Sequence, residues 1–358
     1  MQTFDLAAAL RGEARFGWAE ELVAFSILRG EETPLSAEDA AVLLAIPADR
    51  WVAADGVPPA FVQAGLVLTD GEEGRELRAR DEHLTELGWD LYGALYHAQG
   101  RWRGVVAADS SLETSLLKEE DPLGWLRDRF GGPPPPVVEL GSADAVPLPR
   151  PNPTGGLFEA LERRVTTRRF DGRGLSAELV GTILWAVFGY RRYGTMAGHA
   201  VALRRTSPSG GALHPVEAYP LVIRGDALAP GLYHYAARRH ELEPIRPLDP
   251  AEAESLAERF AAGQSFVSGA AFLIVLAARF ARTYWKYKQH PRAYGVVLMD
   301  AAHLSQTFAL VCAGLGLGAF VTAVVNASDI DDALGLDGFA DGGIALLGCG
   351  YPAPVGAR

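Results

Sequence analysis

Two of the three lysines in the chain stand in one short aromatic segment, YWKYK at 284–288. The chain holds 33 basic residues, and only Lys118, Lys286 and Lys288 are lysines. An amine can accept a proton near neutral pH, whereas a guanidinium cannot. Aromatic neighbours would remove water from Lys286 and make it a usable base, with Tyr287 able to relay a proton. The alternative is a surface loop with cation–π contacts.

Two further segments are suited to a flat, anionic ligand. RRVTTRRFDG at 163–172 places threonine hydroxyls beside closely spaced guanidinium groups, which bind phosphate in a bidentate way. TSPSGGALHPVEAY at 206–219 has small residues that let the backbone approach a ligand closely. Neither GxxxxGK nor GxGxxG occurs, which excludes a Walker loop and a dinucleotide fingerprint. An exposed basic helix end and an ordinary turn are the plain alternatives.

The C-terminal part adds two glycine-containing segments, GLGLGAFVTAVVN at 314–326 and GYPAPVGAR at 350–358. Glycine after an apolar helix permits tight backbone approach. Arg358 is a further candidate phosphate ligand, or simply the end of a tail. Two cysteines, Cys312 and Cys349, are too few for a disulfide framework or a cysteine-rich zinc site, and no metal site is predicted.

The elements that must position these residues form a predicted α+β domain over 156–358. Strands and helices alternate along it, and Ser176 is a predicted helix N-cap. The expected helices cover about 157–165, 176–190 and 295–317, and the expected strands cover 216–224, 231–236, 240–245, 271–279 and 343–351. Proline-rich runs ahead of this domain predict a linker over 105–155.

The remaining residues, 1–104, predict a small winged-helix-like domain. Its expected elements are a helix over 20–29 closed by Gly30, a helix over 36–46 capped by Ser36 and Asp39, a short helix, turn, strand and charged hairpin over about 57–79, and a helix over 81–98. Residues 1–100 carry 18 acidic and 7 basic residues, which argues against a nucleic-acid partner. A clamp that adds a peptide strand beside the wing fits this charge better. The alternative is a plain helical packing domain.

The overall composition sets the class of protein. The chain has 358 residues, 49% of them hydrophobic, and a formal net charge of -11. That length suits about two domains. The absence of a secretory signal or an apolar run of about 18 residues predicts a cytoplasmic protein without a membrane span.

The order of these motifs resembles the nitroreductase superfamily of flavin enzymes. Within it, the chain is most similar to the SagB-type branch, the azole-forming dehydrogenases of ribosomal peptide maturation. The segments that carry the resemblance are PSGGALHPVEAY, GLYHY with HELEPI, KY ahead of RAYG, AAHLSQTFALVCAGLGLG and LGCGYP, with LYHAQ upstream. The resemblance implies a nitroreductase-like fold with a central mixed or antiparallel sheet flanked by helices. It also implies FMN bound between the subunits of a homodimer.

The resemblance also assigns roles to particular residues. It places the flavin phosphate and pyrimidine edge at Arg164, Thr166 and Arg168, and the flavin itself along Ser209, Gly210 and Gly211. His214, which ends the same segment, is a further predicted cofactor-binding residue. The backbone near Val324 and Val325 would face the reactive ring nitrogen, and Arg358 would reach phosphate. Val165 and Thr166 replace the Arg and Ser of the usual RRSxR motif. The Lys-Tyr pair of azole dehydrogenases corresponds to Lys286 and Tyr287.

The implied reaction is oxidation of a thiazoline or oxazoline ring in a ribosomally synthesised precursor peptide. A base takes the Cα proton and a hydride passes to FMN, with Lys286 as the base and Tyr287 assisting it. A cyclodehydratase would be a partner enzyme in such a pathway. Three alternatives remain: another peptide desaturase such as a cyclic-dipeptide oxidase, an NAD(P)H-dependent nitro- or quinone reductase that needs no base, and a non-catalytic peptide-binding scaffold.

Overall fold

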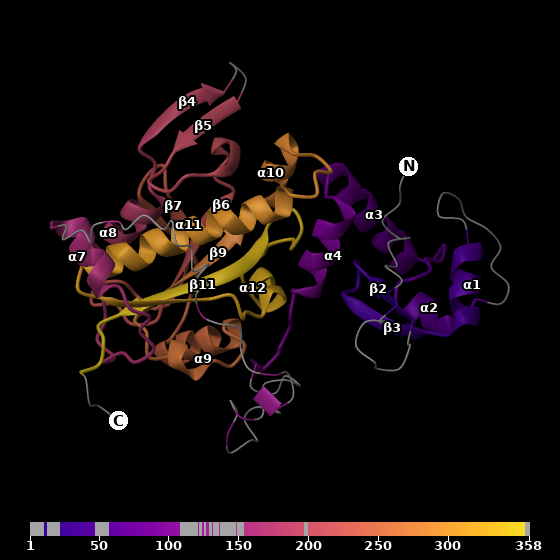
Figure 1. Cartoon of the computed structure of the whole chain (residues 1–358), viewed down its shortest axis with the longest axis horizontal. Coiled ribbons are helices and arrows are strands. Elements are labelled where there is room, and N and C mark those ends of the chain that lie inside the picture. The colour runs from indigo at the N-terminus through magenta and orange to yellow at the C-terminus, as the bar shows by residue number, and fades with distance from the viewer. Residues whose placement is uncertain are drawn as a thin grey trace.

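A six-stranded antiparallel sheet forms the centre of the C-terminal part of the chain (Figure 1). The computed structural model describes residues 11–12, 22–46, 57–107, 154–196 and 200–354, together with single positions between 121 and 148. Across the sheet, the strand order is β10–β11–β9–β6–β7–β8. The strands are β6 (Val216–Val222), β7 (Gly231–Ala236), β8 (Glu241–Pro247), β9 (Phe272–Ala278), β10 (Gly318–Thr322) and β11 (Gly342–Gly350).

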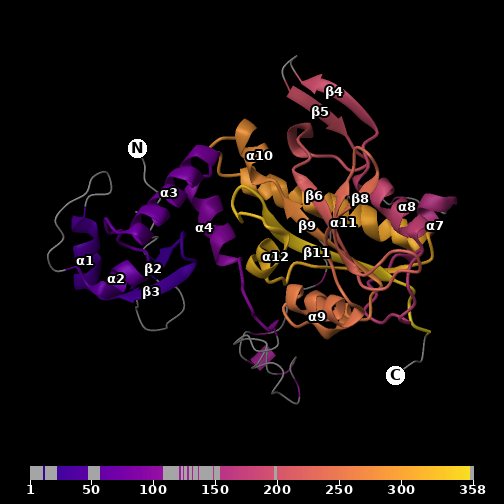
Figure 2. The same cartoon turned by 180° about the vertical axis from the view of Figure 1, so that it is seen from behind.

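Helices cover both faces of this sheet (Figures 1 and 2). Helices α8 (Ala177–Phe188) and α11 (Ala293–Gly314) pack on one face, and α9 (Pro250–Phe260) and α12 (Ala327–Leu334) pack on the other. In β9, Phe272, Ile274 and Leu276 enter the first core, while the alternating Leu273 and Val275 enter the second. Because both faces are covered, the apolar run of this central strand is uninterrupted.

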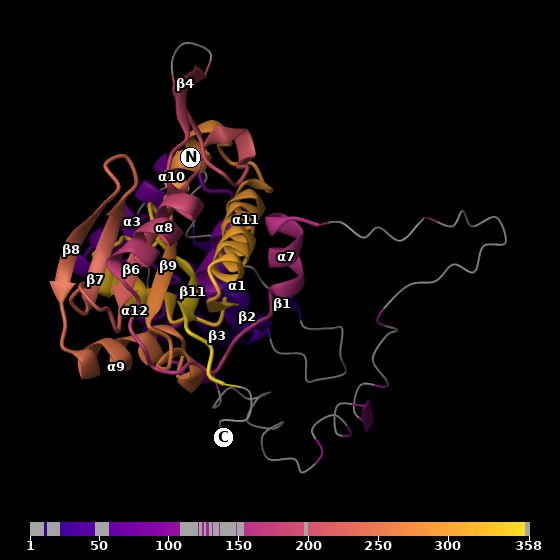
Figure 3. The same ribbon diagram turned by 90° about the vertical axis from the view of Figure 1, so that its left-hand side faces the viewer.

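Helix α11 is the central helix of the first face. By length and composition it could cross a membrane, but Leu304, Phe308 and Cys312 on it pack into the core of the sheet. The short helix α7 (Gly156–Arg163) lies beside it (Figure 3). Above the sheet are the hairpin of β4 (Arg192–Met196) and β5 (Ala200–Arg204), the 3-10 turn η3 (Gly210–Ala212) and helix α10 (Phe280–Lys286). A second 3-10 turn, η4 (Ser265–Val267), precedes β9.

The expected elements of the C-terminal domain are confirmed to within a few residues. The N-cap at Ser176 is also present, since its hydroxyl accepts a hydrogen bond from the Leu179 N–H at 3.2 Å. The sequence analysis did not predict β4, β5, β10, α9 or α12.

The N-terminal part has its own small sheet of β1 (Arg11–Gly12), β2 (Leu22–Ser26) and β3 (Glu31–Leu35), followed by helices α1 (Ala37–Ala45), α2 (Pro59–Gln63), α3 (Glu72–Leu87) and α4 (Leu91–Gln99). Its core includes Ala24, Leu35, Phe61 and Val67. The capping box predicted at the start of α1 is confirmed, because Ser36 and Asp39 each accept a hydrogen bond from the other's backbone N–H.

The helix expected over residues 20–29 is wrong, because these residues supply β2, which pairs with β3. Gly30 lies in the connecting turn with a φ of 71°, and its N–H donates to the Ser26 carbonyl at 2.7 Å. A short apolar run suits a buried strand as well as a helix. Pairing with the neighbouring strand decides between them.

The charged hairpin expected near residue 75 is also wrong, because these residues begin α3. Leu77 and Leu84 are buried on one side of this helix, and Arg78 pairs with Glu82 at 3.1 Å one turn later. The helix expected over 81–98 is two helices, since Gly88 adopts a φ of 84° between α3 and α4. In the sequence, the described strands of this domain precede its helices. The winged-helix assignment is not confirmed.

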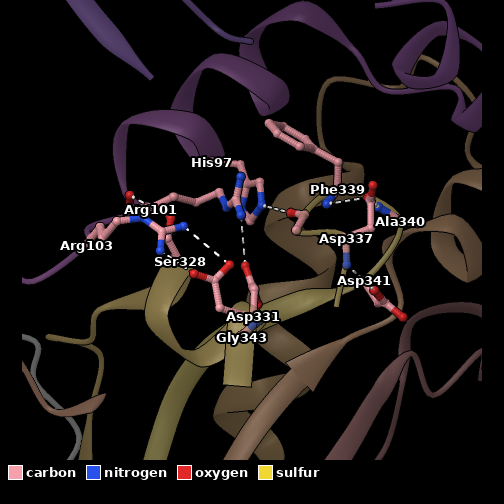
Figure 4. A network of polar contacts seen from close by, with 12 residues as sticks. His97, Arg101, Arg103, Ser328, Asp331, Asp337, Phe339, Ala340, Asp341 and Gly343 are labelled. Carbon is pink, nitrogen blue, oxygen red and sulfur yellow. Dashed lines mark hydrogen bonds and ion pairs between the residues drawn. The ribbon is translucent and has the colours of Figure 1, made fainter. Parts of the chain in front are cut away.

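Residues 101–107 follow α4 and attach the N-terminal part to the larger domain (Figure 4). The Arg101 guanidinium donates to Asp331 at 3.0 Å, and the Gly343 N–H donates to the same carboxylate at 2.7 Å. Burial raises the pKa of Asp331 to about 6, although Arg101 acts in the opposite direction. The Gly104 N–H also donates to Asp329 at 2.7 Å. The two parts of the chain are therefore joined by buried polar contacts.

Candidate active site

The small-residue loop between β5 and β6 is held by a buried carboxylate. The Ser209 hydroxyl and the Gly210 N–H both donate to Asp300 on α11, the second bond at 3.1 Å. Ser209 also accepts a hydrogen bond from the His214 N–H at 2.8 Å. Burial raises the pKa of Asp300, while the two donated hydrogen bonds lower it. The loop is thereby fixed at the N-terminal half of α11.

His214, which was predicted to bind the cofactor, ends this loop inside the fold. It is buried and has a positive φ of 47°. Burial, followed by the charge of Arg205, lowers the pKa of its imidazole to about 4. The guanidinium of Arg205 is itself buried and donates to the Val216 carbonyl at 2.7 Å. The neutral His214 ring therefore supports the loop from within the fold.

Gly211 is the point at which the loop meets Lys286 and Tyr287. A Cβ on Gly211 would stand 2.7 Å from the Lys286 Nζ and 2.6 Å from the Tyr287 Oη. Gly211 also has a φ of 64°, a conformation that L side chains rarely adopt. A Cβ on Gly210 would overlap the side chain of Val296. The amine and the hydroxyl thus reach the same backbone position because it carries no side chain.

Lys286 is the last residue of α10, and Tyr287 follows it. The amine stands 5.4 Å from the centroid of the Tyr287 ring. Lys286 and Trp285 are exposed, whereas Tyr287 is half-buried. The expected removal of water from Lys286 by its aromatic neighbours is therefore absent in the single chain.

The arginine cluster lies at the opposite end of α11. Arg164 follows α7, Thr166 forms a parallel bridge with Ala319 of β10, and Arg168 lies 5.6 Å from the centroid of the Phe266 ring. Among the described residues, Arg163 pairs with Glu159 at 3.6 Å, but neither Arg164 nor Arg168 has a carboxylate partner. These guanidinium groups have the charge and the unoccupied donors that a phosphate requires.

The backbone at Val324 and Val325 follows β10. The Val324 N–H donates to the Thr322 hydroxyl at 3.1 Å, and the Val325 side chain is buried in the second core. The amide of Val324 is therefore already engaged within the chain. Arg358 lies outside the described residues. Among those residues, no group of three His, Cys, Asp or Glu side chains could hold a metal ion.

The two groups of predicted site residues are separated along α11. Asp300 and Val296 mark the end at the glycine loop, while Gly318 beside Thr167 follows the other end. Fourteen helical residues separate Asp300 from the end of α11, about 21 Å at 1.5 Å per residue. A single chain therefore brings Lys286, Tyr287 and the glycine loop together but leaves the arginines at a distance.

Sequence reasoning missed two features of this site. Asp300 was detectable, because it is the one acidic residue in the apolar run VVLMDAAHLSQTFALVCAGLGLG. The contact between Trp89 and Tyr284, whose ring centroids are 4.6 Å apart, joins segments nearly 200 residues apart. No local pattern marks such a contact.

Comparison with known proteins identifies the class to which this fold belongs, an oxidoreductase. The family model described as the nitroreductase family matches residues 161–351. This is more than half of the chain, which therefore belongs to the nitroreductase family. Members of this family generally bind flavin.

Two curated relatives match part of the chain. The trifolitoxin-processing protein TfxB of Rhizobium leguminosarum bv. trifolii is 34% identical over 153 residues, which cover 40% of this chain and 39% of TfxB. A nitroreductase-type protein of Methanocaldococcus jannaschii is 29% identical over 162 residues, which cover 45% of this chain and 75% of that protein. The match thus spans about two fifths of TfxB and three quarters of the second relative.

A solved structure shares the fold over most of the chain. It is a chain of the E. coli microcin synthetase McbBCD complex with truncated pro-MccB17 bound. The TM-score is 0.54 at 20% identity, with 76% of this chain and 97% of that chain covered. Together with TfxB, this similarity agrees with the SagB-type resemblance of the motifs.

Proposed function

We propose that this protein is an FMN-dependent dehydrogenase that oxidises thiazoline or oxazoline rings in a ribosomally synthesised peptide. The observation that carries the proposal is the meeting of the Lys286 amine and the Tyr287 hydroxyl at Gly211. Removing a hydride from an azoline ring also requires removing a proton, so the site needs a base. The similarity to TfxB, a trifolitoxin-processing protein, supports a peptide substrate.

The residues present fit FMN. Arg164 and Arg168 offer guanidinium groups to its phosphate, and Thr166 offers a hydroxyl. Ser209, Gly210 and Gly211 form a loop of small residues that a flat ligand can approach, and Asp300 holds that loop in place. FMN, when bound, supplies the acceptor for the hydride.

The chain's own residues would handle the proton. The Lys286 Nζ takes the proton from the Cα of the azoline as a hydride leaves the adjacent ring carbon. The Tyr287 Oη, which reaches the same glycine, can pass that proton on toward solvent. The two electrons leave with the hydride, and the ring gains the double bond that makes it aromatic.

A homodimer would complete the site. The arginine cluster lies about 21 Å along α11 from the loop. Leu157, Phe158 and Leu161 on α7 and Met299 on α11 expose apolar side chains, and these two helices pack against each other. A second copy covering these helices would bury this surface and bring its arginines to the first copy's lysine.

Mixing two variants tests this dimer at a low FMN concentration, at which Arg168→Gln binds little cofactor and Lys286→Ala lacks the base. If lysine and arginine come from different copies, a heterodimer of Lys286→Ala with Arg168→Gln contains one intact site. With random pairing, co-refolded variants should then recover about a quarter of the wild-type rate. Sites built within one chain would recover nothing, which would contradict the shared site.

The N-terminal domain is proposed as the peptide clamp. Strand β3 is an edge of its described three-stranded sheet, and a peptide strand can add to such an edge. The acidic surplus of residues 1–100 favours basic or apolar anchors on the peptide. Binding of a precursor peptide should then weaken as the salt concentration rises, which calorimetry at two salt concentrations would measure.

A cyclodehydratase that forms the azoline is the partner enzyme that this reaction needs. The proposed site of action is the cytoplasm.

The first test is the visible spectrum of the purified protein, with the released cofactor identified by mass. We expect about one FMN per chain and, with an azoline peptide, a product lighter by two hydrogen atoms. Turnover of a nitroarene with NAD(P)H but no azoline oxidation would support the reductase alternative. Oxidation of an uncyclised peptide would indicate another peptide desaturase. A colourless protein that also fails to bind added FMN would support the alternative of a non-catalytic peptide-binding scaffold.

A further inference from the structure

The segment that carries Lys286 and Tyr287 is held on both sides by the N-terminal domain. The corner between α3 and α4, residues Gly88–Asp90, makes these contacts. Ahead of the lysine, the Tyr284 hydroxyl donates to Asp90 at 3.3 Å, and its ring packs on Trp89. After the lysine, the Gln289 N–H donates to the Gly88 carbonyl at 2.7 Å.

Glycine is needed at this corner because Lys288 lies directly against it. A Cβ on Gly88 would overlap the aliphatic chain of Lys288, and Gly88 has a φ of 84°. Trp89 is fully buried, and its indole N–H donates to the Phe339 carbonyl at 3.0 Å. The corner is therefore a rigid part of the interface between the two parts of the chain.

Helix α10 depends on such contacts for its position. It has seven residues, and isolated helices shorter than about 12 residues are marginal in water. Tyr284 and Lys286 are two residues apart, which places them about 200° around the helix axis. Burying the Tyr284 ring against the corner therefore turns Lys286 to the opposite side, toward Gly211.

Asp90 serves two elements at once. One carboxylate oxygen accepts a hydrogen bond from the Gly93 N–H at 2.9 Å and caps α4, while the other accepts the Tyr284 hydroxyl. Asp90 is buried, and Tyr284 is fully buried. Burial, followed by the charge of Asp90, raises the pKa of Tyr284, so its hydroxyl stays protonated and remains a donor.

We propose that the corner Gly88–Asp90 positions the Lys286 amine over Gly211, with Asp90 acting as the positioning residue through Tyr284. The role of Lys286 as a base rests on the proposed function, but its placement does not. The N-terminal domain would then act on the chemical step as well as on peptide binding. The domain contacts the segment that carries the base at Tyr284, through a hydrogen bond and a ring contact, and at Gln289, through a backbone hydrogen bond.

Tyr284→Phe in the full-length protein is the test, because it removes the hydroxyl and keeps the ring. Tyr294→Phe is the matched control. Tyr294 also packs on Trp89 and loses one buried hydrogen bond, to His97 at 3.1 Å, but it lies on α11. The readout is the rate at which an amine-reactive reagent labels each lysine as a function of pH, measured by mass spectrometry. The chain has three lysines, and Lys118, which is far from this segment in the sequence, is the internal reference.

We expect Tyr284→Phe to change the labelling of Lys286 severalfold relative to Lys118 and to shift its pH profile, and Tyr294→Phe to leave both unchanged. The kcat on an azoline peptide should fall roughly ten- to a hundredfold in Tyr284→Phe with an unchanged KM and FMN content. Asp90→Ser, whose single side-chain oxygen can cap α4 but leaves none for Tyr284, should reproduce the labelling change if Tyr284→Phe folds poorly.

Equal labelling of Lys286 in wild type, Tyr284→Phe and Asp90→Ser would overturn the inference, as would an equal change in Tyr294→Phe. The same experiment distinguishes failure of the positioning inference from failure of the proposed function. If the labelling changes as expected while Lys286→Ala still oxidises azolines at the wild-type rate, the positioning stands and the base assignment fails.

Discussion

At the N-terminal end of α11, the residues proposed for chemistry are fixed by contacts from the glycine loop, α10 and the N-terminal domain. At its C-terminal end, Arg164 is half-buried and Arg168 lies over the Phe266 ring, and neither has a carboxylate partner among the described residues. The first end holds its proposed proton acceptor through several contacts from different parts of the chain. The second end offers charge to a ligand that must bring its own complementary groups. Under the proposed function, one chain would therefore complete the geometry for proton transfer but not the binding site for the cofactor.

The largest expected effect is at the fixed end. Lys286→Ala should lower kcat on an azoline peptide about 10²- to 10⁴-fold, the usual contribution of a general base, without loss of FMN. Steady-state kinetics and the flavin spectrum measure the two quantities. Lys286→Arg keeps the positive charge but cannot accept a proton, so it should be as inactive. Recovery of activity in Lys286→Arg would show that charge, and not basicity, is needed.

The next effect concerns the open end. Arg168→Gln should raise the Kd for FMN about 10- to 100-fold, because a hydrogen bond to a charged group contributes about 1.5–3 kcal/mol. The kcat at saturating FMN should change little. Arg163→Gln is the control, since Arg163 is already paired with Glu159. Flavin fluorescence titrations compare the two variants, and similar Kd values for both would remove Arg168 from the phosphate site.

A pair of glycines compares the two ends directly. Gly211 and Gly172 have φ values of 64° and 81°, so alanine costs about 1–2 kcal/mol of backbone strain at either position. Only at Gly211 does the added methyl meet the lysine amine and the tyrosine hydroxyl, whereas at Gly172 it meets open space. We expect Gly211→Ala to lower kcat about tenfold and Gly172→Ala to leave it within twofold. Equal kcat values would mean that Lys286 does not act at Gly211.

The smallest expected effect is on the free energy of unfolding. It concerns His97, which contacts the N-terminal end of α11 through Tyr294. Burial lowers the pKa of the His97 imidazole to about 3, whereas an unfolded histidine titrates near about 6.5. Below that value the unfolded chain binds a proton that the folded chain does not, so stability falls as the pH falls. His97 should thereby remove about 2 kcal/mol of unfolding free energy between pH 7 and pH 5.

Urea unfolding at the two pH values measures this difference. His97→Gln should be less stable at pH 7 but should show a smaller decrease toward pH 5. The same decrease in wild type and His97→Gln would assign the pH dependence to other groups.

Much of the catalytic domain followed from local pattern. The run FLIVLAA predicted a buried strand because both faces of β9 are covered. Ser36 and Ser176 marked helix starts, since their hydroxyls satisfy free N–H groups. Strand β10 was not predicted, because GLGLGAF is rich in glycine and its local pattern is typical of a loop. Pairing with β11 makes it a strand. The same short-range ambiguity gave a helix at residues 20–29 and a hairpin at the start of α3.

The sequence by itself determined which residues could do chemistry: the rare lysine, the tyrosine beside it, the small-residue loop and the arginine cluster. Residue type fixes basicity, charge and the absence of a side chain, and these properties do not depend on the fold. Only the tertiary structure decided that Lys286 stands at Gly211, 75 residues away in the chain, and that Asp90 and Trp89 hold it there. Such contacts depend on long-range packing, which couples segments that share no local pattern, and the same packing left the arginines at the far end of α11.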